Sequence, residues 1–140
     1  MESKIIEEFQ IFIEEDFEVS VNSIKARLAE FGFDQKLSIL EEMYAANQYQ
    51  RIFYKFMAAL FCFDNKKIDE ALIIYKSIVE EFDEYKLEKW VPKFILFVLE
   101  KYYRILDKQD QMGEKEKIYK KILSLSPKKG IELNRGENYA

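Results

Sequence analysis

The stretch YQRIFYKFMAALFCF, residues 49–63, is apolar on almost every side when it is drawn as a helix. It contains no Gly or Pro, and its only charged residues are Arg51 and Lys55. A surface helix has a polar face, whereas a helix that is apolar all round is buried. The sequence therefore predicts a helix over about 49–63 at the centre of the protein, with the other elements packed around it.

Amphipathic helices are predicted on both sides of this central helix. Apolar residues recur three or four positions apart with charged residues between them, which is the period of a helix with one buried face. Gly32 is expected to end one of these helices, and Asp34 to cap the next. The predicted ranges are about 2–16, 21–31, 35–44, 68–82, 92–106 and 114–125.

The composition favours an all-α protein of about seven antiparallel helices. The 140 residues are 49% hydrophobic and 16% aromatic, which is enough for one core. Only 4 Gly and 2 Pro are present, whereas a sheet protein of this length needs frequent turn residues. We expect a single helical domain over 1–127. Residues 128–140 lack periodicity and are predicted to form a flexible C-terminal tail.

A short sequence pattern occurs twice. Ile74 to Val79 reads IYKSIV, and 44 positions later residues 118–123 read IYKKIL. Each copy follows a largely apolar helix and a polar joint. The chain is therefore predicted to repeat a helical hairpin, first over 49–82 and then over 90–126. An irregular helical bundle is the alternative reading of the same pattern.

This repeat resembles the tetratricopeptide repeat, a two-helix unit of about 34 residues. In the first copy, Ala59 and Ala71 stand at the family's small-residue positions and Tyr75 at its aromatic position. In the second copy, Tyr103 and Lys115 stand where small residues are expected. The end of the family's pattern is matched in the second copy by Tyr119, Leu123, Leu125 and Pro127.

The resemblance covers residues 50–127 and implies a protein-binding groove lined by the first helix of each hairpin. It maps groove positions onto Phe53, Phe56, Leu60, Phe97, Glu100 and Arg104. The Lys and Asn residues that hold a peptide carboxylate in some members are absent from these positions. The two Phe residues of the first hairpin are expected to pack against the preceding helices.

The residue types argue against catalysis. The sequence has no histidine, which is the commonest general base and metal ligand, and Cys62 is its only cysteine. The carboxylates occur as neighbours, such as Glu7-Glu8 and Glu41-Glu42, and neighbouring residues on a helix do not face each other. We therefore predict no enzyme, no catalytic residue, no metal and no cofactor.

Membranes and nucleic acids are not expected as partners. The longest apolar stretch, Phe56 to Phe63, is far shorter than the roughly 20 residues of a membrane span. Only four of the 22 basic residues are Arg, and no basic stripe suits a phosphate backbone. The acidic start is unlike a signal peptide, and a lone cysteine fits a reducing compartment, so a cytoplasmic location is predicted.

The residues that favour a binding role are Tyr, Trp and Arg beside the two most apolar helices, since these types are enriched in interface hot spots. The predicted partner-binding residues are Tyr49, Arg51, Tyr54, Lys55, Trp90, Lys93, Glu100, Tyr102, Tyr103 and Arg104.

The leading hypothesis is a non-catalytic protein–protein interaction module, an adaptor or inhibitor that binds and occludes a partner protein. The Lys-, Ile-, Phe-, Tyr- and Asn-rich composition is typical of AT-rich genomes, so a phage or bacterial accessory or defence role is one version. One alternative is a regulatory helical-repeat domain that senses a peptide. The other is a structural homo-oligomer, because residues 1–18 carry a net charge of −6 and residues 101–140 a net charge of +4.

Overall fold

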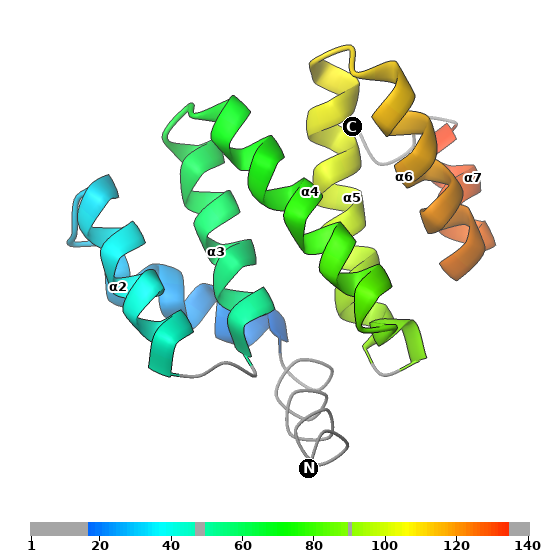
Figure 1. Cartoon of the computed structure of the whole chain (residues 1–140). Helices are drawn as coiled ribbons and strands as arrows, with labels where there is room; N and C mark the ends of the chain where they lie inside the picture. The colour runs from blue at the N-terminus through cyan, green and yellow to red at the C-terminus, as the bar shows by residue number, and fades with distance from the viewer. Residues whose placement is uncertain (1–16, 47–49, 90, 135–140) are drawn as a thin grey trace. The chain divides into compact units, whose positions relative to one another are not determined.

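The computed structural model describes residues 17–46, 50–89 and 91–134. Within these ranges 88% of the residues are helical and none is in a strand, so the predicted all-α fold is confirmed. The predicted helix over 2–16 lies outside the described residues. The described α-helices are residues 17–28, α2 (Phe33–Ala46), α3 (Arg51–Asp64), α4 (Ile68–Glu84), α5 (Pro92–Lys108), α6 (Met112–Leu125) and α7 (Pro127–Asn134), with a short 3₁₀ helix, η2 (Leu87–Lys89) (Figure 1).

Helix α3 is buried along most of its length, as its composition predicts. It packs against α2 on one side and α4 on the other (Figure 1). Arg51 and Lys55 are only partly buried, and Phe63 and Asp64 at its end are exposed. Its buried residues are Ile52, Phe53, Tyr54, Phe56, Met57, Ala58, Ala59, Phe61 and Cys62.

Helix α4 shows the one-sided pattern that its sequence predicts. Its buried residues are Ala71, Tyr75, Ile78, Val79 and Phe82, which share one face of a helix. Ile73, on the opposite face, is exposed. Ala59 of α3 and Ala71 of α4 are both fully buried, which fits the close packing of these two helices.

The ring of Phe94, in the first turns of α5, lies at the centre of an aromatic cluster. Its centroid is 5.8 Å from that of Phe17, 5.8 Å from Phe56, and 6.2 Å from both Phe53 and Phe82. Three of these contacts are edge-on, with interplanar angles of 72° to 89°. Edge-on pairs add to the free energy gained by burying the rings. The start of α5 is therefore anchored among residues of the N-terminal half.

The chain divides into two compact units between Phe94 and Ile95, within α5. The first unit contains helix 17–28, α2, α3, α4 and the start of α5. The second contains the rest of α5, with α6 and α7, which pack against each other. The predicted single domain over 1–127 stays a prediction.

The loop between α3 and α4 and the loop between α5 and α6 have the same structure. Lys66 and Asp110, which are 44 positions apart, both adopt a positive φ, of 63° and 55°. The next residue in each loop, Lys67 or Gln111, donates its N–H to the carbonyl five residues earlier, at 2.8 Å and 3.1 Å. This is the bond that closes a Schellman helix end. The 44-residue offset of the sequence repeat is therefore also the offset between equivalent loops.

The C-terminal tail is the main correction to the sequence prediction. Residues 128–134 belong to α7 and are not a flexible tail, whereas residues 135–140 lie outside the described residues. The preceding helix ends at Leu125, as the predicted range 114–125 has it, and Pro127 begins α7, where its fixed φ suits the first helical turn. At Gly130 a Cβ atom would lie 2.6 Å from Leu123 Cδ1. Helix α7 can therefore pack this closely on α6 only because residue 130 has no side chain. Because glycine has no apolar side chain, this contact cannot be recognised as an apolar period in the sequence.

The start of α2 is a smaller correction. Asp34 lies inside the first turn, where its charge suits the helix dipole, and it does not precede the helix as a cap. The residue before the helix is Gly32, whose carbonyl accepts the N–H of Lys36 at 2.9 Å. The Gly32 N–H in turn donates to Gln35 Oε1 at 3.2 Å. Gln35 therefore supplies the side-chain half of the cap that was assigned to Asp34.

Phe94→Ala tests the aromatic cluster. Removing a fully buried ring leaves a cavity that four other rings cannot fill, so the free energy of unfolding should fall by about 3–5 kcal/mol. Urea denaturation followed by circular dichroism measures the change. Phe63→Ala is the matched control, because that ring is exposed at the end of α3 and its loss should cost less than about 1 kcal/mol. Equal losses in the two variants would show that Phe94 has no special part in the core.

Candidate functional site

Two of the predicted binding residues, Tyr49 and Trp90, lie outside the described residues. The remaining eight fall into two groups, at the start of α3 and along α5. The structure assigns most of them to contacts that hold helices together.

At the start of α3, Arg51 and Lys55 both pair with Glu81 of α4. Lys55 Nζ lies 2.9 Å from Glu81 Oε2, and Arg51 Nη2 contacts Glu81 Oε1. Lys55 also donates to the hydroxyl of Ser77. The Glu81 side chain is only 12% exposed, so its charge needs these partners. The pairs fasten the start of α3 to the C-terminal half of α4.

Tyr54 is buried, so its ring is not accessible to a partner. Its hydroxyl donates to Gln50 Oε1 at 2.8 Å, and its ring lies 5.8 Å from the rings of both Tyr44 and Phe53. The Tyr44 hydroxyl is buried and has no hydrogen-bond partner in the part of the chain that the structure describes. Burial raises the pKa of both tyrosines. Tyr54 therefore belongs to the packing around α3.

Along α5, three predicted residues contact α6 or α7. Tyr102 is buried and its hydroxyl donates to Glu114 Oε2 at 2.7 Å. Glu100 pairs with Lys129 Nζ of α7 at 3.4 Å. Tyr103 is also buried, with its ring 6.1 Å from that of Tyr119. These contacts hold the second unit together.

The two departures from the tetratricopeptide pattern contact each other. Lys115 Nζ lies over the ring of Tyr103, 5.6 Å from its centroid, and Lys115 also pairs with Asp107. The hydrogen bond to Asp107 raises the pKa of Lys115. The first hairpin has Ala59 and Ala71 at the equivalent positions. The second hairpin thus replaces a pair of small residues by a cation–aromatic pair.

The groove implied by the resemblance is not open in the first hairpin. Phe53 and Phe56 are fully buried, and both rings lie close to Phe94 of the later helix α5, whereas packing against the preceding helices was expected from the sequence. Of the remaining predicted residues, Lys93 is exposed and Arg104 is half-buried. The Nε of Arg104 is buried without a hydrogen-bond partner among the described residues.

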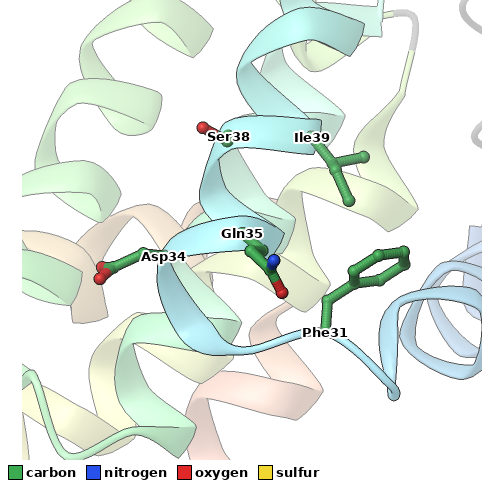
Figure 2. Close-up of a pocket in the computed structure, with 5 residues that line it drawn as sticks. All are labelled: Phe31, Asp34, Gln35, Ser38 and Ile39. Atoms are coloured by element: carbon green, nitrogen blue, oxygen red, sulfur yellow. The ribbon is translucent and has the colours of Figure 1, made fainter.

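A solvent-facing hollow that the sequence did not indicate lies where α2 begins (Figure 2). Its volume is about 400 Å³, and it is lined by Phe31, Asp34, Gln35, Ser38 and Ile39. Figure 2 shows Phe31 and Ile39 on one side of the α2 ribbon, and Asp34 and Ser38 pointing to the other. Phe31 is 41% exposed, although such a ring is usually covered. The hollow therefore has an apolar edge and a polar edge.

Negative charge surrounds this hollow. Asp34 lines it, and Glu30, Glu41 and Glu42 are exposed on the adjoining turn and on α2. Lys36, the only base of α2, lies over the ring of Phe61 at 5.0 Å. The hollow and these three glutamates are called the acidic hollow below. It suits a side chain that is apolar and flanked by positive charge.

Metal binding, membrane insertion and thiol chemistry each depend on features that can be sought in the described residues. Within residues 17–46, 50–89 and 91–134, no group of three or more Cys, Asp and Glu residues could hold a metal ion. None of the helices described is long and apolar enough to cross a membrane. Cys62 is buried, and burial raises the pKa of its thiol, so it is a poor nucleophile.

Comparison with protein-family models, with curated proteins and with solved structures finds no match for this chain.

Glu81→Gln tests whether Arg51 and Lys55 serve the fold. The substitution keeps the size of the side chain but leaves two cations without their counter-charge, so the free energy of unfolding should fall by about 1–3 kcal/mol. Glu80→Gln, at the exposed neighbouring position, should change it by less than about 0.5 kcal/mol. Urea titration measures both variants. A loss in Glu81→Gln no larger than in the control would leave both cations available to a partner.

The buried tyrosines predict a loss of stability at high pH. Burial raises the pKa of Tyr75, with a smaller effect of Asp64, and it also raises the pKa of Tyr44. The folded state then holds these protons more tightly than the unfolded state, in which tyrosine has a pKa of about 10. The contribution of these tyrosines to the free energy of unfolding should therefore be constant below that pH and should fall above it, by about 1–3 kcal/mol at pH ~11.

Tyr75→Phe isolates the tyrosine effect from the titration of lysines, which both proteins share. The variant should lose about 1 kcal/mol less than the wild type between pH ~8 and ~11, as measured by urea denaturation. Parallel pH profiles for the two proteins would contradict this assignment.

Proposed function

We propose that this chain is a non-catalytic protein-binding module that acts by occupying a surface of its partner. The observation that carries the proposal is the acidic hollow, in which the half-exposed ring of Phe31 lies beside Ile39. Exposed aromatic and branched side chains in a hollow are typical anchors of a protein interface. Among the described residues of the first unit, most other large apolar side chains are buried in its core.

The negative charge around the hollow indicates which kind of partner segment would bind there. The exposed acids Glu30, Glu41 and Glu42 favour a segment with Lys or Arg close to an apolar anchor. An exposed rim charge mainly accelerates association, while the buried anchor sets how long the complex lasts. We therefore propose that Phe31 and Ile39 provide most of the binding affinity. The exposed glutamates would determine which partner binds.

An adaptor and an inhibitor would both use such a surface. An inhibitor would cover the working surface of its partner, and an adaptor would leave it accessible. The peptide-sensing alternative draws support from the two hairpins with equivalent loops, but Phe53 and Phe56 are buried where its groove would be. The acidic hollow is thus the better supported binding surface.

Affinity capture with matched variants tests the proposal. The tagged full-length chain is used to capture proteins from its native host, and mass spectrometry identifies a companion present in equal amount. The double variant Phe31→Ala with Ile39→Ala should lose at least about 90% of that companion, because truncating a central anchor costs about 2 kcal/mol or more. Circular dichroism confirms that the variant is folded.

The control removes one exposed aromatic ring and one exposed Ile from α4 and its end. Ile73→Ala with Tyr85→Ala should retain the companion at the wild-type level, since neither residue lines the hollow. Retention of the companion by the Phe31 and Ile39 variant would refute the hollow as the binding surface. Failure to capture any companion would count against the protein-binding role itself.

A further inference from the structure

A second surface with exposed apolar side chains lies on α6 and α7. Leu123 is 37% exposed and Ile131 is 47% exposed. Leu123 packs directly against Gly130, the residue before Ile131, so both exposed side chains lie close to where α6 and α7 meet. Lys120 lies one turn before Leu123, and Lys128 one turn before Ile131, and both lysines are exposed. These four residues are called the basic face below.

The charge of this region is positive. Residues 112–134 contain six Lys and three Glu, a net charge of +3. Two of the glutamates have partners within the second unit, because Glu114 accepts from Tyr102 and Glu132 pairs with Lys129 at 3.4 Å. The third, Glu116, lies 3.7 Å from Lys120. The outward charge around the patch is therefore carried mainly by lysines.

The acidic hollow has the opposite character. Its apolar edge is Phe31 and Ile39, and the exposed charges of α2 are all carboxylates. Of the bases in this region, Lys36 lies over Phe61 and Lys25 pairs with Asp64 at 3.9 Å, both residues of α3, whereas Arg27 of helix 17–28 is exposed. The two surfaces are thus complementary. Each has apolar side chains at its centre, and the charges around them are opposite in sign.

We propose that the occupant of the acidic hollow, in the absence of another partner, is the basic face of a second copy of this chain. This proposal rests on the proposed function because it uses the same hollow. It adds the basic face as a second surface and a second copy of the chain as the partner. Leu123 and Ile131 of one copy would cover Phe31 and Ile39 of the next, while Lys120 and Lys128 face Glu41 and Glu42. Burial of these apolar groups supplies the affinity, and the charges set the register.

The two contacting surfaces are different, so the contact is heterologous. Such contacts either close into a ring, of which a dimer is the smallest, or continue as an open chain. Only four apolar side chains would meet in this contact, so association should be weak and should depend on both concentration and salt.

The first measurement is the mass of the purified full-length protein in solution. Light scattering over about 1–500 µM should show a mass that rises above the 16.9 kDa of one chain. Raising the NaCl concentration from about 50 to about 500 mM should weaken association about tenfold, because the charges are exposed and screened. A mass of one chain at every concentration and low salt would overturn the proposal.

A charge swap provides the decisive test. The variant Glu41→Lys with Glu42→Lys reverses the two charges of the hollow that would face the lysines, and Lys120→Glu with Lys128→Glu reverses the two charges of the basic face. Each variant alone should be monomeric, because the residues at positions 41 and 42 then carry the same sign as those at positions 120 and 128, which they would face. An equimolar mixture should associate again to at least the wild-type mass, since both possible contacts join opposite charges. A mixture that stays monomeric, or single variants that associate like the wild type, would overturn the proposal.

The control reverses two acids outside the hollow. Glu80→Lys with Glu84→Lys changes the net charge as much as the hollow variant does, on exposed positions of α4. It should associate like the wild type, and its failure to do so would assign the effect to net charge and overturn the inference. Circular dichroism shows that all variants are folded. Capture of a companion protein by a chain that is monomeric when pure would leave the proposed function standing while refuting self-association.

Discussion

The ring of Phe94 lies edge-on among rings from helix 17–28, α3 and α4, and this packing follows from the composition of α3. A helix that is apolar all round cannot leave any face in water. The neighbouring elements must therefore supply covering side chains, and the first turns of α5 supply Phe94. The same demand explains Glu81, because the two basic groups of α3 reach the edge of the buried region and need a nearby counter-charge. The aromatic packing and the ion pairs around α3 thus have the same cause, which is that this helix is buried on nearly every side.

Much of this fold can be predicted from the sequence, because periodicity reports how a helix is buried. The apolar run of α3 and the one-sided pattern of α4 each indicate the environment that the structure shows. The 44-residue repeat likewise indicates two hairpins whose loops prove to be equivalent. Helix α7 is different, because it buries only Gly130 and Leu133. A glycine that permits close approach contributes no apolar side chain, so a lysine-rich segment around it has no detectable period.

The candidate site was harder to predict, since residue type alone does not distinguish an interface from a core. Tyr102 and Tyr103 are the kinds of residue that interfaces use, yet in this chain they bind α6 through Glu114 and Lys115. Phe31 is the opposite case, because the helix predicted over 21–31 would place it on the buried face, but its ring is 41% exposed. It continues the spacing of Val21, Ile24 and Leu28, but the helix ends at residue 28, so the ring leaves the buried face and lines a hollow. Where a helix stops decides which side chains remain available.

The two proposed roles of the acidic hollow constrain each other. One hollow of about 400 Å³ cannot hold the basic face of a second copy and a partner protein at the same time. The two occupants therefore compete, and any affinity of the chain for itself lowers its apparent affinity for the partner by mass action. A weak self-contact has a physical advantage in this arrangement. It covers Phe31 and Ile39 while no partner is present, which limits nonspecific apolar contacts, and it is displaced without a large cost when the partner arrives.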